Sequence, residues 1–292
     1  VLVLTGVTMA GEFVGGVVTR SLSLQGDAFH MLSHLLSIAL SYAAIVIASR
    51  PAPPDKTYRY WRVEILAGLF NALALLPAAA YILYESYRRF RDPVEIHPGG
   101  TLAVGAIGLV VNIACAALLH HHAKHDLNIR GAFVHMLADG ASSVGVLVAG
   151  AAVYFWGWTY ADPLVALLIT VLILAWCGSL LRSSVRILLE SAPRDMNLDD
   201  LQAAMKRVDG VVEVHDLHVW TITSRMVALT AHVRLKGDVP VSESEKIARR
   251  LEAMLDERWE INHATFQFEV GEGRELDCER AHEPPGGCAS DN

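Results

Sequence analysis

Residues 24–48 read LQGDAFHMLSHLLSIALSYAAIVIA, and Asp27 is the one residue of this stretch that carries a full charge at neutral pH. A membrane-spanning helix needs about 20 predominantly apolar residues, so the stretch predicts a helix that crosses a bilayer. Other parts of the chain have a similar composition. The six predicted spans are about 1–18, 24–48, 64–84, 101–119, 131–155 and 163–185. The first is the weakest, because it is short, rich in glycine and contains Glu12.

The composition divides the chain into two unlike parts. Of the 292 residues, 53% are apolar and 19% are charged, whereas soluble domains have roughly 45–50% apolar and about 25% charged residues. Up to Glu190 there are 12 Lys and Arg against 11 Asp and Glu, and from Ser191 onward there are 12 against 20. The charge-poor part fits a membrane domain over 1–190. The acidic balance of the remainder argues against a nucleic-acid-binding protein, and the whole pattern excludes a disordered chain or a disulfide scaffold.

Lys and Arg residues in the loops predict the orientation. Nine of them follow the second, fourth and sixth spans, and four lie on the other side: Arg20, Arg88, Arg89 and Arg91. Cytosolic loops carry the excess of positive charge in membrane proteins. We therefore expect an integral membrane protein with both termini in the cytosol.

The periodicity changes after Pro193. Asn197 suits the start of a helix that includes Leu201 and Met205. Residues 212–223 and 226–235 alternate like two half-buried strands, a second amphipathic helix is expected over 242–257, and a third strand over 263–270. The order predicts a small α+β domain over 194–270, of αββαβ type and ferredoxin- or metallochaperone-like, followed by a tail without periodicity over 271–292.

Two predicted spans carry paired polar residues. His30 and His34 in one span, and His135 and Asp139 in another, are each spaced i,i+4 and therefore lie one turn apart on one helix face. Ionisable residues inside a bilayer are costly and point to function. Four such ligands match a tetrahedral Zn²⁺ site, although imidazole also suits cobalt, nickel and copper. Asp27, about one turn before His30, is a candidate accessory group.

Other polar residues in the spans fit a structural role equally well. They can form hydrogen bonds between helices, and so can single histidines. These residues are Glu12, Glu64, Asn71, Asn112 and Asp162.

The sequence resembles a known family, the cation diffusion facilitators, which are six-span exporters of divalent metals. The matching stretches are SLSLQGDAFHML (21–32), YRYWRVEILAGLFNALALL (58–76), NIRGAFVHMLADGASSVGV (128–146), DPLVALLITVLIL (162–174), LLESAP (188–193), VHDLHVW (214–220) and NHATFQFE (262–269). The resemblance implies a homodimer in a bacterial inner (plasma) membrane that works by alternating access, with the metal bound between the second and fifth spans and exchanged for protons. Histidine supplies a physical reason, because it titrates near neutrality and must be neutral to bind metal.

One position departs from the family pattern. Zinc-transporting members usually have a carboxylate where His34 stands, so the four ligands here carry one negative charge instead of two. This substitution leaves the metal open between Zn²⁺, which we favour, and Co²⁺, Ni²⁺ or Cd²⁺.

The resemblance also implies accessory metal sites. A histidine cluster between the fourth and fifth spans corresponds to the family's proposed metal-collecting loop, although it also fits a solvated helix end: His120, His121, His122 and His125. In the C-terminal domain, His215, His232 and Glu269 match ligands of a structural or regulatory zinc ion, and Gln267 replaces a histidine. The tail residues Cys278, His282 and Cys288 resemble a further thiolate site. In the loop between the second and third spans, Lys56 and Tyr60 replace histidines of other members, so we expect no metal there.

Two other functional classes compete with a transporter. A membrane-anchored metal sensor would have no use for paired ligands inside its spans. A metallohydrolase would need an open coordination position and a general base. We therefore expect a transporter that interacts with lipid, divalent metal ions and protons, that is not an enzyme and that binds no nucleic acid.

Overall fold

The computed structural model describes residues 2–120, 127–223 and 226–271. The chain forms two compact units, an N-terminal unit over Val1–Ser184 and a C-terminal unit over Val185–Asn292. Each unit has its own core and is described by itself.

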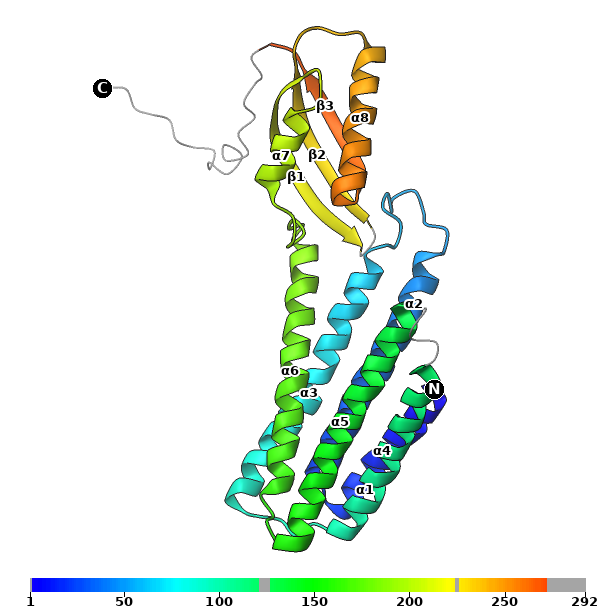
Figure 1. Ribbon diagram of the computed structural model, residues 1–292, viewed down its shortest axis with the longest axis vertical. Coiled ribbons are helices and arrows are strands. Elements are labelled where there is room, and N and C mark those ends of the chain that lie inside the picture. Colours follow the sequence, from blue (N-terminus) through cyan, green and yellow to red (C-terminus); the bar gives the residue numbers. More distant parts are fainter. Residues whose placement is uncertain (1, 121–126, 224–225, 272–292) are drawn as a thin grey trace, which may run out of the picture. The chain divides into compact units, whose positions relative to one another are not determined.

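The N-terminal unit is built from long apolar helices (Figure 1). In chain order they are α1 (Leu2–Thr19), α2 (Leu22–Ala48), α3 (Val63–Arg91), α4 (Pro98–His120), α5 (Leu127–Trp156) and α6 (Ala161–Leu188). Five of them are long and apolar enough to cross a membrane, and α1 is a shorter apolar helix. The prediction of a six-span helical membrane protein is therefore confirmed.

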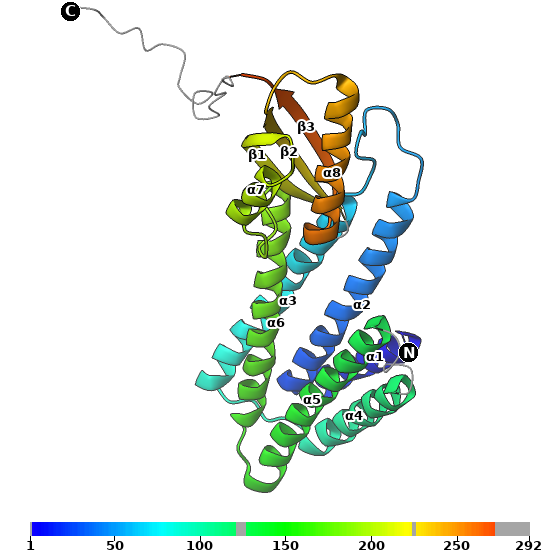
Figure 2. The same ribbon diagram turned by 45° about the horizontal axis from the view of Figure 1, so that its top comes forward.

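The helices pack so that α2 and α5 form one of the central contacts. Helix α1 packs on α2 and α4, α4 packs on α5, and α2 packs on both α3 and α5. Figure 2 shows the pair α1 and α4 on the side of α5 away from α3 and α6. Large side chains such as Phe70, Val148 and Leu168 are exposed, which suits a surface in contact with lipid rather than water. Polar residues of α2 and α5 can therefore meet inside the bundle.

A buried ion-pair network joins α2, α3 and α6. The Asp162 carboxylate accepts hydrogen bonds from the Ser21 hydroxyl at 2.7 Å and from the Leu22 amide at 2.6 Å, so it caps the first turn of α2. Arg89 donates to Asp162 at 3.2 Å and to Glu85 at 3.1 Å. The sequence placed Arg89 among the charges of a loop, whereas α3 continues to Arg91 and Arg89 is buried within it.

The C-terminal unit follows the αββαβ order. Its elements are α7 (Leu198–Lys206), β1 (Val211–Thr223), β2 (Met226–Leu235), α8 (Val241–Trp259) and β3 (Ile261–Glu269). The sheet has the order β1-β2-β3, with β1 and β2 antiparallel and β2 and β3 parallel. The Asn197 side chain caps α7 by accepting from the Asp199 amide at 3.0 Å. The predicted α+β domain is therefore confirmed, with helix and strand ends within a few residues of those expected.

One face of this sheet covers the hydrophobic core, and the other carries polar side chains. Leu201 of α7 and Leu251 of α8 pack with Leu229 and Val233 of β2 in a single buried cluster. Since successive residues of a strand point to opposite faces, His232 lies on the face away from this core. The strands therefore present polar residues together without disturbing the packing beneath them.

Candidate metal centre

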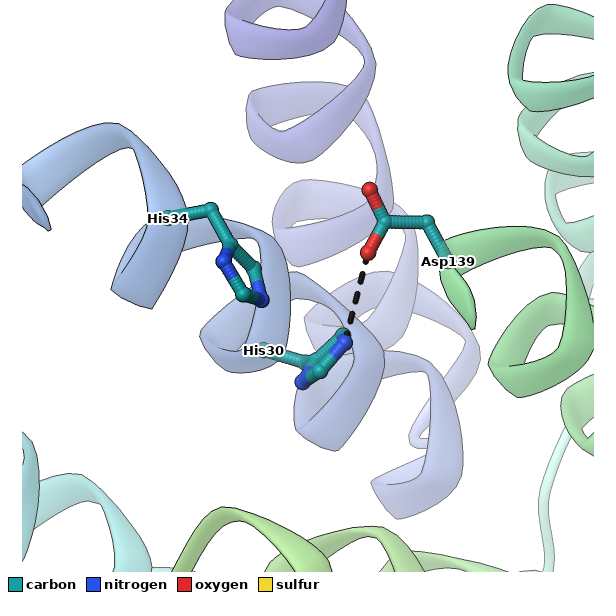
Figure 3. Close-up of side chains that lie close together, drawn as sticks. All are labelled: His30, His34 and Asp139. Atoms are coloured by element: carbon teal, nitrogen blue, oxygen red, sulfur yellow. Dashed lines mark ion pairs between the residues drawn. The ribbon is translucent and has the colours of Figure 1, made fainter. Parts of the chain in front are cut away.

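Helices α2 and α5 bring three predicted ligands together inside the N-terminal unit. His30 and His34 lie one turn apart on α2, with their ring centroids 4.8 Å apart. The Nε2 atom of His30 is 3.3 Å from Oδ1 of Asp139 on α5, and Asp139 is fully buried (Figure 3). One ligand atom from each residue lies within 4.8 Å of the others. We call His30, His34 and Asp139 the transmembrane cluster.

The fourth predicted ligand, His135, belongs to the same helix face as Asp139. It lies four residues before Asp139 in α5, and this spacing places the two positions one turn apart. Its side chain is outside the described part of the chain, so His135 as a ligand stays a prediction.

Asp27 lies beside the transmembrane cluster and is held by serines of α5. Its Oδ1 accepts from the Ser142 hydroxyl at 2.6 Å, and its Oδ2 accepts from the Ser143 hydroxyl at 3.0 Å. Asp27 is fully buried. It does not belong to the group of ligand atoms in the cluster, but it places a second carboxylate next to it. Asp27 is therefore suited to offset the charge of a bound cation.

A third helix borders the cluster. The ring centroid of Trp176 on α6 lies 6.0 Å from that of His34. The donor set of the described cluster is two imidazoles and one carboxylate. This set suits zinc and other divalent transition metals and is a poor match for Mg²⁺ or Ca²⁺, which prefer oxygen ligands.

The C-terminal unit contains a second group of suitable ligands, one from each strand. His215 Nε2 lies 3.2 Å from Glu269 Oε2, and His232 Nδ1 lies 2.8 Å from Glu269 Oε1. His215 and His232 are direct partners in the β1–β2 register, with ring centroids 5.3 Å apart. Their ligand atoms also lie within 4.8 Å of one another. We call His215, His232 and Glu269 the sheet cluster.

Two neighbours support the sheet cluster. Gln267, in register with His232, donates to Glu269 at 3.2 Å. Asp216 lies at a register shift of β1 with a φ of 48°, and its carboxylate is 3.0 Å from His218 and 3.6 Å from His232. Asp216 is not predicted from the sequence, because strict alternation places it on the face opposite His215. The two histidines that flank Asp216 in the sequence, His215 and His218, are the signal that could have pointed to it.

The remaining predicted sites are only partly described. His120 ends α4, is exposed, and its ring lies 5.4 Å from that of Phe133. The loop residues His121, His122 and His125 and the tail residues Cys278, His282 and Cys288 lie outside the described residues. In the α2–α3 loop, Asp55 pairs with Lys56 at 3.2 Å.

Comparison with known proteins gives matches along both units. Residues 1–189 match the family model of the cation efflux transmembrane domain, and residues 193–270 match that of the cytoplasmic domain of cation efflux proteins. A solved structure of the metal-bound C-terminal domain of the CzcD transporter from Cupriavidus metallidurans is 34% identical. It covers 25% of this chain and 99% of that chain, at a TM-score of 0.23, too low for a comparison of folds.

Full-length relatives cover most of the chain. The metal cation efflux system protein CzcD of Cupriavidus metallidurans is 39% identical over 94% of this chain and 87% of its own length. The cadmium, cobalt and zinc/H(+)-K(+) antiporter of Bacillus subtilis is 37% identical over 89% and 84%. The zinc transporter ZitB of Escherichia coli is 34% identical over 92% and 86%. The chain therefore belongs to the cation efflux family, and it is an integral membrane protein that exports divalent metal cations and not an enzyme.

Proposed function

We propose that this protein exports Zn²⁺ in exchange for protons, as a homodimer that works by alternating access in a bacterial inner membrane with both termini in the cytosol. The observation that carries the proposal is the transmembrane cluster, in which two histidines of α2 face a buried aspartate of α5. Such a group lies in the interior of a bundle whose outer surface is apolar. A helix that served only as an anchor would have no use for it.

The charge of the cluster bears on the choice of metal. With neutral imidazoles, Asp139 contributes the single negative charge of the described ligands, so a bound divalent cation leaves a net positive charge. Asp27, buried one turn before His30, offsets this charge. Among the relatives, the Escherichia coli protein is named a zinc transporter and the Bacillus subtilis protein a cadmium, cobalt and zinc antiporter. Zinc is common to both names, whereas a histidine-rich donor set also accepts Co²⁺, Ni²⁺ and Cd²⁺.

Proton exchange follows from the same ligands. His30 and His34 bind a metal only as neutral imidazoles, so metal binding displaces protons from whichever of them is charged. On the opposite side of the membrane, protons that return to the imidazoles weaken metal binding and favour release. His135 is proposed as the fourth ligand and as a further group that takes part in this exchange.

The C-terminal unit is proposed as a cytosolic domain over 194–270 that mediates dimerisation and binds a second zinc ion at the sheet cluster. The two imidazoles and the Glu269 carboxylate form a compact set of three protein ligands on the sheet face away from the core. Zinc at this position would link all three strands and stabilise the domain. The proposed tail site and the histidine loop would add ligands outside this cluster.

Transport by purified protein in proteoliposomes tests the proposal. Zn²⁺, Co²⁺, Ni²⁺, Cd²⁺ and Mn²⁺ are compared in parallel, with and without an imposed pH gradient. We expect Zn²⁺ flux that rises with the proton gradient and is lost in His30→Ala. His97→Ala is the matched control, because His97 is an exposed histidine of the same unit outside the cluster. Zinc flux that is indifferent to the gradient would contradict proton exchange, and metal binding without any flux would favour a membrane-anchored sensor.

A further inference from the structure

A buried carboxyl group on α1 is not used by the mechanism described so far. Glu12 is 1% exposed. Its side chain lies against the backbone of α4, where a Cβ atom on Gly108 would collide with Oε1 of Glu12. A side chain at position 108 would require the Glu12 carboxyl group to move, so Gly108 allows this group to approach the backbone of α4.

The surroundings of Glu12 favour the protonated form. Neither carboxyl oxygen has a hydrogen-bond partner among the residues that the structure describes, and the same holds for Oδ1 of Asn112, one turn after Gly108 on α4. An ionised carboxylate without donors in an apolar interior costs several kcal/mol. A protonated carboxyl is neutral and has one O–H donor, and Asn112 offers a buried acceptor on the face of α4 that Glu12 contacts.

Asn112 also connects this region to the transmembrane cluster. Its Nδ2 donates to the Ser143 hydroxyl at 3.3 Å, and that hydroxyl lies 3.0 Å from Oδ2 of Asp27. Among the described residues, the charged side chains near enough to act electrostatically on Glu12 are Asp27 of α2 and Asp139 of α5. Helix α4 contributes the uncharged Asn112. Hydrogen bonds through Asn112 and Ser143 therefore connect the neighbourhood of Glu12 to the Asp27 carboxylate beside the transmembrane cluster.

We propose that Glu12 is a proton-binding site of the transporter, separate from the metal ligands, which holds a proton while the transmembrane cluster is empty and releases it when a divalent metal binds. The inference rests on the proposed metal–proton exchange. A bound cation adds positive charge beside Asp27 and Asp139, and a nearby positive charge favours the ionised form of a carboxyl group against the cost of burying it. The O–H bond of the Glu12 carboxyl then breaks, the carboxylate remains, and the proton passes to water.

A monovalent metal cation is the other ion that a buried carboxylate and an amide oxygen could bind. The relative from Bacillus subtilis is named a cadmium, cobalt and zinc/H(+)-K(+) antiporter. Oε1 of Glu12 occupies the space directly beside the Gly108 backbone, so no ion fits on this side of the carboxyl group. A proton needs no cavity, whereas K⁺ needs oxygen ligands around it, so the packing favours the proton.

The experiment counts protons released per metal ion bound. Full-length protein in detergent, with His215 and His232 changed to alanine so that the sheet cluster is silent, is titrated with Zn²⁺ in buffers of different ionisation enthalpy. We expect Glu12→Gln to release about one proton fewer than the parent protein, and Glu12→Asp to retain the release. Thr8→Val is the matched control, because Thr8 is buried one turn before Glu12 and its hydroxyl donates to the Leu4 carbonyl at 2.9 Å.

Several outcomes would overturn the inference. One such outcome is that Glu12→Gln binds Zn²⁺ and releases as many protons per metal ion as the parent protein. Another is release of the proton on addition of K⁺ without zinc, which would identify a site for K⁺ instead. If the Glu12→Gln variant fails to fold, a second measurement on the parent protein and on Glu12→Asp tests the inference. The infrared difference spectrum of the parent protein should show the loss of a protonated-carboxyl band when zinc is added. In Glu12→Asp the frequency of this band should be shifted. Absence of the band from the spectrum of the parent protein contradicts the proposal. Because both measurements follow binding, they stand apart from the flux assay that tests proton-driven transport.

Discussion

Replacement of Asp139 by asparagine tests the electrostatic basis of the transmembrane cluster. The change keeps the size of the side chain but removes the one carboxylate of the described ligand set, whose Oδ1 lies 3.3 Å from His30 Nε2. Two unit charges 4 Å apart attract by about 4 kcal/mol at an effective dielectric constant of about 20, which is a lower limit for the attraction of a divalent ion. At about 1.4 kcal/mol per tenfold change, Asp139→Asn should weaken zinc binding on the order of 1,000-fold.

The assay is calorimetric titration of purified protein with Zn²⁺, again with His215 and His232 changed to alanine. Asp27→Asn is the matched comparison, since Asp27 is an equally buried aspartate that contacts Ser142 and Ser143 instead of the ligand group. A residue that acts through its neighbours typically changes metal affinity about 10–100-fold. The assignment of Asp139 as a ligand would be refuted if the zinc affinity of Asp139→Asn were within tenfold of that of the parent protein. A higher zinc affinity in Asp139→Asn than in Asp27→Asn would refute it as well.

Three further predictions concern other positions. Arg89→Met should lower the thermal unfolding temperature in detergent without changing metal preference, because it leaves Asp162 without its cationic partner at a cost of about 3–5 kcal/mol; an unchanged unfolding temperature would show that the network contributes little. Glu269→Gln should weaken zinc binding at the sheet cluster about tenfold or more, measured against a His30→Ala background, because it removes the carboxylate that contacts both histidines; equal affinity would place the metal elsewhere. His34→Asp should shift the relative transport rates toward Zn²⁺ and away from Co²⁺ and Ni²⁺, and an unchanged order in parallel flux assays would show that this position does not set selectivity.

The general architecture could be predicted from the sequence because its signals are local. Long apolar stretches predict spans, alternation predicts strands, and the i,i+4 spacing of His30 with His34 places both on one helix face. The extension of α3 beyond the predicted span has a cause that is not local. Its last turns contain Glu85 and Arg89, which look like a solvated loop, and they stay helical and buried because Asp162, 73 residues further along the chain, pairs with Arg89.

The sheet cluster shows a similar limit. Periodicity places His232 on the face away from the core, and β1 and β2 then align His215 with it. Alternation does not predict the direction of the Asp216 side chain, because the register shifts beside it and its backbone adopts a left-handed conformation. An irregularity of one residue thereby turns a carboxylate toward His218 and His232, and no pattern of alternating residues predicts where such a bulge occurs.

Buried acidic residues of the N-terminal unit differ in what satisfies them, and this difference separates structural from functional roles. Asp162 accepts hydrogen bonds from two serine hydroxyls, two backbone amides and Arg89, so its carboxyl oxygens are fully used in holding helices together. Asp139 faces His30, a partner that can give way to a metal ion. Glu12 lies against glycine backbone with no donor among the described residues. The same chemical group therefore suits a structural anchor, a metal ligand and a proton carrier, according to the donors that the neighbouring helices supply.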